Sequence, residues 1–188
     1  MLPATAKVWL QGLLLAFACM LPAAAQETCL ACHGPDGNSV TPGIPSIAGQ
    51  PSTFLETQLV LIREELRPAP QMLPIVKAMS DTEIVGLAAH FSRLPARAVS
   101  ATAPDGKLMQ QGMERAKALR CGVCHLPDFS GQKQVPRLAG QREDYLLSEL
   151  QAYRDDQRKG GDTIMSAALY RVADEDLKAL AHFLSHTP

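Results

Sequence analysis

The sequence lacks the features that would indicate nucleic-acid binding. Its 18 basic and 19 acidic residues are interspersed, so the formal net charge is −1 at pH 7 and no run of like charge forms a basic patch or an acidic tail. Beyond the N-terminus, no apolar stretch approaches the roughly 20 residues that a membrane-spanning helix needs. Strand patterns are also missing, and apolar residues recur instead at helical spacing. We therefore expect an all-α protein with no nucleic-acid partner.

Cysteine is scarce too, but its placement is regular. One of the five cysteines lies in the apolar N-terminal segment, and the other four form two C-x-x-C-H motifs, at residues 29–33 and 121–125. This is the pattern by which a c-type haem is attached covalently. In each motif the two thiols would add to the porphyrin vinyl groups, and the histidine that follows would ligate the iron. The predicted attachment residues are Cys29, Cys32, Cys121 and Cys124.

Residues 1–25 have the organisation of a secretory signal peptide. Lys7 is the only charge in this segment, an apolar run follows it, and three alanines precede residue 26. We expect cleavage after Ala25 and a periplasmic mature protein. An uncleaved segment that acts as a membrane anchor is the alternative.

Other uses of paired cysteines fit this chain less well. A zinc site commonly needs two such pairs about 15–20 residues apart, whereas 88 residues separate Cys32 from Cys121. A thioredoxin-like motif requires a βαβ context, and a structural disulfide leaves the histidine after each pair unexplained. The doubled motif in an exported protein therefore predicts two covalent haem c groups, each with one iron.

The chain is an internal repeat. A shift of 91–93 residues aligns matching segments in the same order: PSIAGQ at 45–50 with PRLAGQ at 136–141, Met72 with Met165, and His90-Phe91 with His182-Phe183. We read these two histidines as helix-packing residues rather than ligands. A haem would supplement the small core of each domain. The predicted division is a signal peptide (1–25), a first cytochrome c domain (26–95), a linker (96–104) and a second cytochrome c domain (105–188).

Helical periodicity and end signals locate the main helices. Thr53 with Glu56, and Ser80 with Glu83, have the spacing of a capping box. The stretches 34–52 and 126–142 are rich in glycine and proline and are predicted loops. The predicted helices are 53–66, 81–94, 106–120, 143–157 and 174–186.

The sixth ligand of each iron is predicted from the repeat. Met72 and Met165 occupy matching positions, 39 residues after His33 and 40 residues after His125, in segments that read as loops. Ligation by histidine and methionine is a known c-type arrangement that raises the reduction potential. Met79 matches a valine and is read as core packing, which is the alternative for the other two methionines as well.

Further repeat-matched residues suit supporting roles. The carbonyl groups of Pro45 and Pro136 could accept the second N–H of the proximal imidazoles, while Ile47 and Leu138 would pack on the porphyrins. Four matched arginines would either pair with haem propionates or be solvated beside acidic neighbours: Arg63, Arg67, Arg154 and Arg158.

Taken together, these residues resemble the dihaem cytochrome c4 family, which consists of two class I cytochrome c domains in tandem. The resemblance rests on CLACHG at 29–34, on the two Ala-Gly-Gln stretches and on the paired methionines, and it covers residues 26–188. It implies a non-enzymatic one-electron carrier in the periplasm, between a dehydrogenase or quinol-oxidising donor and a terminal oxidase or other acceptor. Peripheral association with the membrane is common in the family.

Two other functions stay open on the sequence. A dedicated cytochrome subunit of a periplasmic dehydrogenase would have a lasting partner. A dihaem peroxidase would need an iron site that can open, which the paired methionines disfavour.

One departure from the class I pattern concerns the first domain. Only residues 26–28 would precede the first motif after cleavage, whereas the second motif follows a predicted helix. We therefore expect Ile84, Leu87 and Phe91 to be partly exposed, and to be covered by the second domain or by a partner protein.

Overall fold

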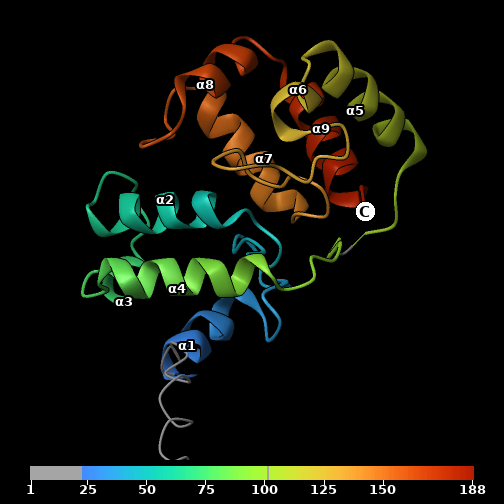
Figure 1. Ribbon diagram of the computed structural model, residues 1–188. Helices are drawn as coiled ribbons and strands as arrows, with labels where there is room; N and C mark the ends of the chain where they lie inside the picture. Colours follow the sequence, from blue (N-terminus) through green and yellow to red (C-terminus); the bar gives the residue numbers. More distant parts are fainter. Residues whose placement is uncertain (1–22, 101) are drawn as a thin grey trace, which may run out of the picture.

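The chain folds into two helical lobes joined by a linker (Figure 1). The computed structural model describes residues 23–100 and 102–188, and these contain no strand, only an isolated bridge between Gln132 and Val135. The predicted all-α class is thus confirmed. We call the lobe before the linker the first repeat and the lobe from residue 105 onward the second repeat. The helices are α1 (Ala23–His33), α2 (Ser52–Arg63), α3 (Leu73–Val76) and α4 (Asp81–Ser92) in the first repeat, and α5 (Gly106–Ala118), α6 (Gly122–His125), α7 (Glu143–Arg154), α8 (Thr163–Leu169) and α9 (Asp174–His186) in the second.

The N-terminal prediction lies largely outside the described residues. The structure does not describe residues 1–22, so the signal peptide and its cleavage stay predictions. None of the helices in the described part of the chain has the length and apolarity to cross a membrane. The backbone is helical from Ala23 into the first motif, and α1 therefore extends further upstream than the sequence predicts.

The apolar face of α4 is buried, contrary to the prediction. Ile84, Leu87 and Phe91 are 1%, 1% and 3% exposed. Leu87 and Phe91 pack with Leu55 of α2 and with side chains from α1 and from the loop before α2, which include Cys29, Leu30 and Ile47. The first repeat therefore covers this face with its own residues, and the face gives no argument for a partner protein.

In the second repeat, α5 crosses α9 at a glycine. α9 packs against both α5 and α7. Gly112 of α5 is buried, and a Cβ atom at this position would overlap the carbonyl oxygen of Ala179 and the Cβ atom of Phe183. The two helices can approach closely because residue 112 has no side chain.

Helices α2 and α7 both end three residues earlier than predicted, at Arg63 and Arg154. Shortly after each helix one residue adopts a left-handed conformation, Glu65 with φ 59° and Asp156 with φ 54°. The next N–H donates to the carbonyl group five residues earlier, at 2.8 Å in both cases. This hydrogen bond is that of a Schellman motif. The early end leaves Leu66, the last residue of the first predicted helix, 58% exposed.

One of the two predicted capping boxes is present. The Ser80 hydroxyl accepts a hydrogen bond from the Glu83 N–H, and the Glu83 carboxylate accepts one from the Ser80 N–H. The box predicted for Thr53 and Glu56 is wrong, because α2 begins one residue earlier. There the Glu56 carboxylate accepts a hydrogen bond from the Ser52 hydroxyl at 2.7 Å.

Two equivalent hydrogen bonds define how the repeats correspond. The Gly49 N–H donates to the Phe91 carbonyl of α4, and the Gly140 N–H donates to the Leu184 carbonyl of α9, both at 3.0 Å. The glycines are 91 residues apart (140 − 49), but their partners are 93 apart (184 − 91). The sequence alignment matched His90 with His182, which are 92 residues apart. The structural separation of 93 in these helices shows that this match is one residue out of register.

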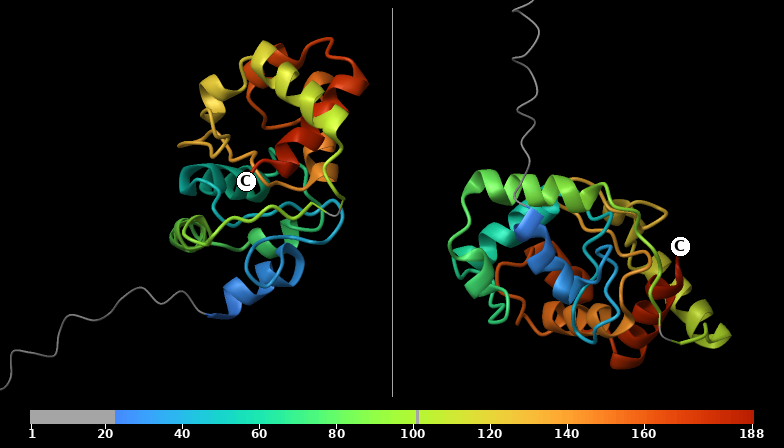
Figure 2. Two further views of the ribbon diagram at one scale, coloured as in Figure 1. Left: turned by 90° about the vertical axis from the view of Figure 1, so that its right-hand side faces the viewer. Right: turned by 90° about the horizontal axis from the view of Figure 1, so that it is seen from below.

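The two repeats meet through the predicted loops 34–52 and 126–142. The left view of Figure 2 shows the second repeat above the first. Gln50 and Gln141 each bind the backbone of the opposite loop. The Asn38 side chain binds the backbone at two points where the linker begins. The two loops therefore form a polar contact between the lobes, and the first loop also binds the start of the linker.

We predict that Gly112→Ala lowers the free energy of unfolding of the haem-loaded protein by about 1–3 kcal/mol, because the added methyl group forces α5 away from α9. Guanidinium unfolding followed by helical circular dichroism measures this change. Gly106→Ala is the matched control on the same helix, since no atom lies within 4 Å of a Cβ there. It should change the stability by less than about 1 kcal/mol. Equal effects of the two substitutions would contradict the role of Gly112.

Candidate haem-binding sites

The first C-x-x-C-H motif lies in the last turns of α1. His33 is 6% exposed, and its Nδ1 lies 2.7 Å from the carbonyl oxygen of Pro45. A carbonyl oxygen can only accept a hydrogen bond, so Nδ1 carries the proton and Nε2 carries the lone pair. A histidine held in this way presents Nε2 to a metal in a fixed orientation.

The second motif repeats this geometry on a shorter helix. Cys121 directly precedes α6, which contains Cys124 and His125. His125 is 4% exposed, and its Nδ1 lies 2.9 Å from the carbonyl oxygen of Pro136. The two motifs, 92 residues apart in the sequence (125 − 33), are therefore built around the same bond between an imidazole and a proline carbonyl.

Burial affects the protonation of the histidine and of the first cysteine in each motif. Burial lowers the pKa of His33 and of His125, although the proline carbonyls act in the opposite direction. Both imidazoles are therefore neutral near pH 7, the form that ligates a metal. Burial also raises the pKa of the Cys29 and Cys121 thiols.

Apolar side chains line both sites. Ile47 packs with Cys29 against the core of the first repeat, and Leu138 packs with Cys121 against the core of the second. Each motif supplies two cysteines, and the hydrogen bonds described for both proximal histidines use Nδ1 alone. Each motif thus combines two thiols, an available Nε2 and apolar neighbours, and these residues fit a covalently attached haem.

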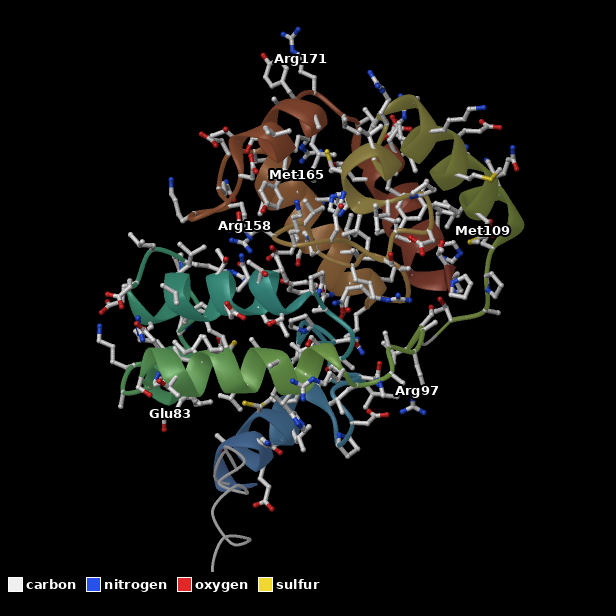
Figure 3. All side chains as sticks on the ribbon, viewed as in Figure 1. Glu83, Arg97, Met109, Arg158, Met165 and Arg171 are labelled. Atoms are coloured by element: carbon white, nitrogen blue, oxygen red, sulfur yellow. The ribbon has the colours of Figure 1, made fainter. Side chains whose placement is uncertain are left out.

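The two methionines predicted as sixth ligands lie in different local structures. Met165 is in α8 and packs against the core of the second repeat (Figure 3). The loop predicted around it is wrong, because the Asp162 carboxylate accepts a hydrogen bond from the Ile164 N–H and starts a helix. Met72 is half-buried and directly precedes α3. Met79 packs against the first core, as expected for a residue with a packing role.

Two of the four matched arginines hold helices together within a repeat. Arg63 and Arg154 donate to the carbonyl groups before α4 and α9, at 2.9 and 3.3 Å. They also pair with Asp81 and Asp174, the first residues of those helices. These contacts fasten the end of α2 to the start of α4, and the end of α7 to the start of α9.

The other two arginines meet at the boundary between the repeats. Arg67 donates to Gln58 at 2.8 Å and to the Tyr145 hydroxyl at 3.0 Å. Arg158 donates to Gln58 at 3.1 Å and pairs with Glu149 at 2.5 Å, and Figure 3 shows it on the side of the second repeat that faces α2. The side chains of Arg67 and Arg158 are 16% and 8% exposed, so the predicted alternative of solvated side chains is wrong for these two arginines. Two guanidinium groups share the Glu149 carboxylate here, so these three side chains together carry a net positive charge.

His182 packs between helices, as the sequence predicts. Its Nε2 accepts a hydrogen bond from the Asp105 N–H at 2.8 Å, and its Nδ1 lies 3.2 Å from the Glu143 carboxylate. With Glu143 and His186 it forms a group of three metal-ligand side chains in the described part of the chain. Both ring nitrogens of His186 also lie within hydrogen-bond distance of carbonyl oxygens. Hydrogen bonds within the protein therefore account for this group.

Sequence reasoning assigned no role to Gln50 and Gln141, the last residues of the two matched stretches. Each is 5% exposed and hydrogen-bonded to the opposite repeat. The available signal was a glutamine directly after a matched glycine in both repeats. The partners of the two glutamines could not be read from the sequence, because each contact joins residues about one repeat length apart in the chain.

Comparisons with known proteins agree with these two sites. The cytochrome c family model matches residues 22–94 and 109–188. The chain is 32% identical over 170 residues to cytochrome c4 of Thiocapsa roseopersicina, covering 86% of this chain and 88% of that protein. It is 30% identical over 172 residues to a thiosulfate dehydrogenase electron acceptor of Stutzerimonas stutzeri, covering 86% and 80%. The crystal structure of reduced recombinant cytochrome c4 from Pseudomonas stutzeri is similar with a TM-score of 0.79 at 29% identity, covering 88% of this chain and 98% of that one. The chain therefore belongs to the dihaem cytochrome c4 family of electron carriers, in which two tandem cytochrome c domains each hold a covalent haem c.

Proposed function

We propose that this protein carries single electrons in the periplasm, from a dehydrogenase or quinol-oxidising donor to a terminal oxidase or other acceptor. His33 and Met72 are the axial ligands of one iron in this proposal, and His125 and Met165 are those of the other. Haem c supplies reversible one-electron chemistry when it is bound. The residues of the chain hold the imidazoles, keep water from them and set the reduction potentials.

The observation that carries this proposal is the buried, oriented imidazole that follows the two cysteines of each motif. His33 and His125 are 6% and 4% exposed, and a proline carbonyl accepts the Nδ1–H of each. A haem c held by these residues would have a proximal ligand in a fixed orientation, as an electron carrier requires. Val123, between the two cysteines of the second motif, is 64% exposed and would offer an apolar contact to a redox partner.

A second candidate function is that of a dedicated electron-accepting subunit. The thiosulfate dehydrogenase electron acceptor to which this chain is 30% identical favours it. Such a subunit would use the same two haem sites, but it would stay bound to its dehydrogenase. The two functions therefore differ in the lifetime of the complex and not in the chemistry of the sites.

We predict that Met165→Ala and Met72→Ala each convert one of the two irons from low spin to high spin. An alanine methyl group cannot replace a thioether ligand, so the iron in the altered repeat loses its sixth ligand. Electron paramagnetic resonance of the oxidised protein measures the high-spin fraction, which should be about half of the total haem in each variant.

Met113→Ala is the matched control, because Met113 is 46% exposed on α5. This variant should keep both irons low-spin. A pyridine haemochrome assay must show two haems per chain in all three variants, so that the loss of a ligand is not confused with the loss of a haem. An unchanged spectrum in Met165→Ala or Met72→Ala would show that the wrong ligand is named for that iron.

We further predict that the mature protein purified from the periplasm elutes alone in size-exclusion chromatography at physiological ionic strength. A carrier that alternates between donor and acceptor must dissociate from each of them. Its elution with a dehydrogenase in a fixed ratio, retained when the salt concentration is raised, would instead favour the dedicated subunit.

A further inference from the structure

The proximal histidine of the first repeat is hydrogen-bonded to the carbonyl group of a peptide unit. The N–H group of the same peptide unit is hydrogen-bonded to the second repeat. The carbonyl oxygen of Pro45 accepts the His33 Nδ1–H at 2.7 Å. The N–H of the same peptide group belongs to Ser46, and it donates to Oε1 of Gln141 at 2.8 Å. A chain of two hydrogen bonds therefore leads from the imidazole of one repeat, through one peptide group, to a glutamine of the other.

The second repeat has the same chain in the opposite direction. The carbonyl oxygen of Pro136 accepts the His125 Nδ1–H at 2.9 Å. The N–H of that peptide group belongs to Arg137, and it donates to Oε1 of Gln50 at 3.0 Å. Each glutamine thus contacts the peptide group that orients the proximal histidine of the opposite repeat.

A second hydrogen bond fixes the orientation of each glutamine amide. Nε2 of Gln141 donates to the Ser46 carbonyl at 2.9 Å, and Nε2 of Gln50 donates to the Arg137 carbonyl at 2.9 Å. The amide can make both bonds only with Oε1 directed at the N–H group. Both glutamines are 5% exposed, so water competes little with these bonds.

The backbone holds both glutamines in place. Gly49 and Gly140, which directly precede them, adopt left-handed conformations with φ 66° and 67°. Their N–H groups donate to carbonyl groups in the last turns of α4 and α9. The position of each amide is therefore tied to the last helix of its own repeat, and the contact it makes lies in the other repeat.

The polarity of a peptide group links its two ends. An acceptor on the N–H side increases the negative charge on the carbonyl oxygen. A more negative carbonyl oxygen draws the Nδ1 proton and makes the imidazole a stronger donor to iron. Stronger donation stabilises oxidised iron and lowers the reduction potential of that haem. Loss of the acceptor should therefore raise the potential.

We propose that Gln50 and Gln141 are positioning residues that each lower the reduction potential of the haem in the opposite repeat. Gln141 acts on the haem at His33, and Gln50 acts on the haem at His125. The inference deepens the proposed function and rests on it for the use of the two potentials. It is tested on purified protein without any redox partner, so its failure and that of the electron route are distinguishable.

The test replaces each glutamine by methionine, which has a similar length but no amide. Gln141→Met should shift the electron-exchange equilibrium between the two haems about three- to tenfold toward reduction of the haem at His33. A tenfold shift corresponds to 59 mV for a one-electron couple. Gln50→Met should give the same shift toward the haem at His125. Potentiometric titration, with the haems assigned by nuclear magnetic resonance, measures both shifts.

A second readout follows the hydrogen bond itself. In the reduced protein, the Nδ1–H proton of His33 should resonate at higher field in Gln141→Met than in the unaltered protein, while that of His125 should not move. Gln58→Met is the matched control, since Gln58 also contacts the opposite repeat through Arg158 but does not touch either proline peptide. It should leave both Nδ1–H signals in place.

Three results would overturn the proposal. One is a shift confined to the haem of the repeat that carries the substitution, another is an equal shift of both haems by all three variants, and the third is no shift at all. Gln141→Glu keeps an acceptor for the Ser46 N–H and serves if Gln141→Met does not fold. It should not raise the potential of the haem at His33, and a rise would contradict the role of Oε1.

Discussion

The hydrogen bond between the proximal imidazole and a proline carbonyl is the constraint on which the rest of the structure depends. To bring Pro45 and Pro136 within 2.7 and 2.9 Å of Nδ1, the loop after each motif must fold back on itself. In the first repeat the Gly37 carbonyl accepts two N–H groups of the returning stretch, and in the second repeat the Phe129 carbonyl does the same. Both residues have left-handed backbone conformations, with φ 77° for Gly37 and 56° for Phe129. The same turn is thus made once with glycine and once with phenylalanine.

This fold-back also determines how the repeats associate. The returning stretches lie at the boundary between the lobes, so loops rich in polar groups make part of the contact there. Polar side chains of α2 and α7 around Arg67 and Arg158 make another part. In the described part of the chain every fully buried side-chain nitrogen or oxygen has a hydrogen-bond partner. Such a boundary fixes one relative orientation, because each buried polar group loses its partner if the lobes slide. A fixed orientation keeps two electron-transfer sites at a constant separation.

Much of this arrangement could be predicted from the sequence, since the repeat, the motifs and the five predicted helices are local patterns. α9 runs over the predicted residues, and α5 starts at the predicted one. The errors have physical causes. Glu65 and Asp156 end α2 and α7 without the glycine that usually marks such an end. The burial of α4 depends on side chains from α1 and from a loop, which no helical periodicity reveals. The sequence pattern also does not reveal the partners of Gln50 and Gln141, because they lie in the other repeat.

The reciprocal contacts of the two glutamines have a consequence for the protein as a modular unit. Each lobe contains a complete haem motif but lacks one of the side chains that complete its own loop. If a lobe were excised at the linker, it would present a bare peptide group at residue 46 or 137 where the partner amide normally lies. Separation of the lobes would therefore leave the Ser46 and Arg137 N–H groups to bind water in place of a buried glutamine amide.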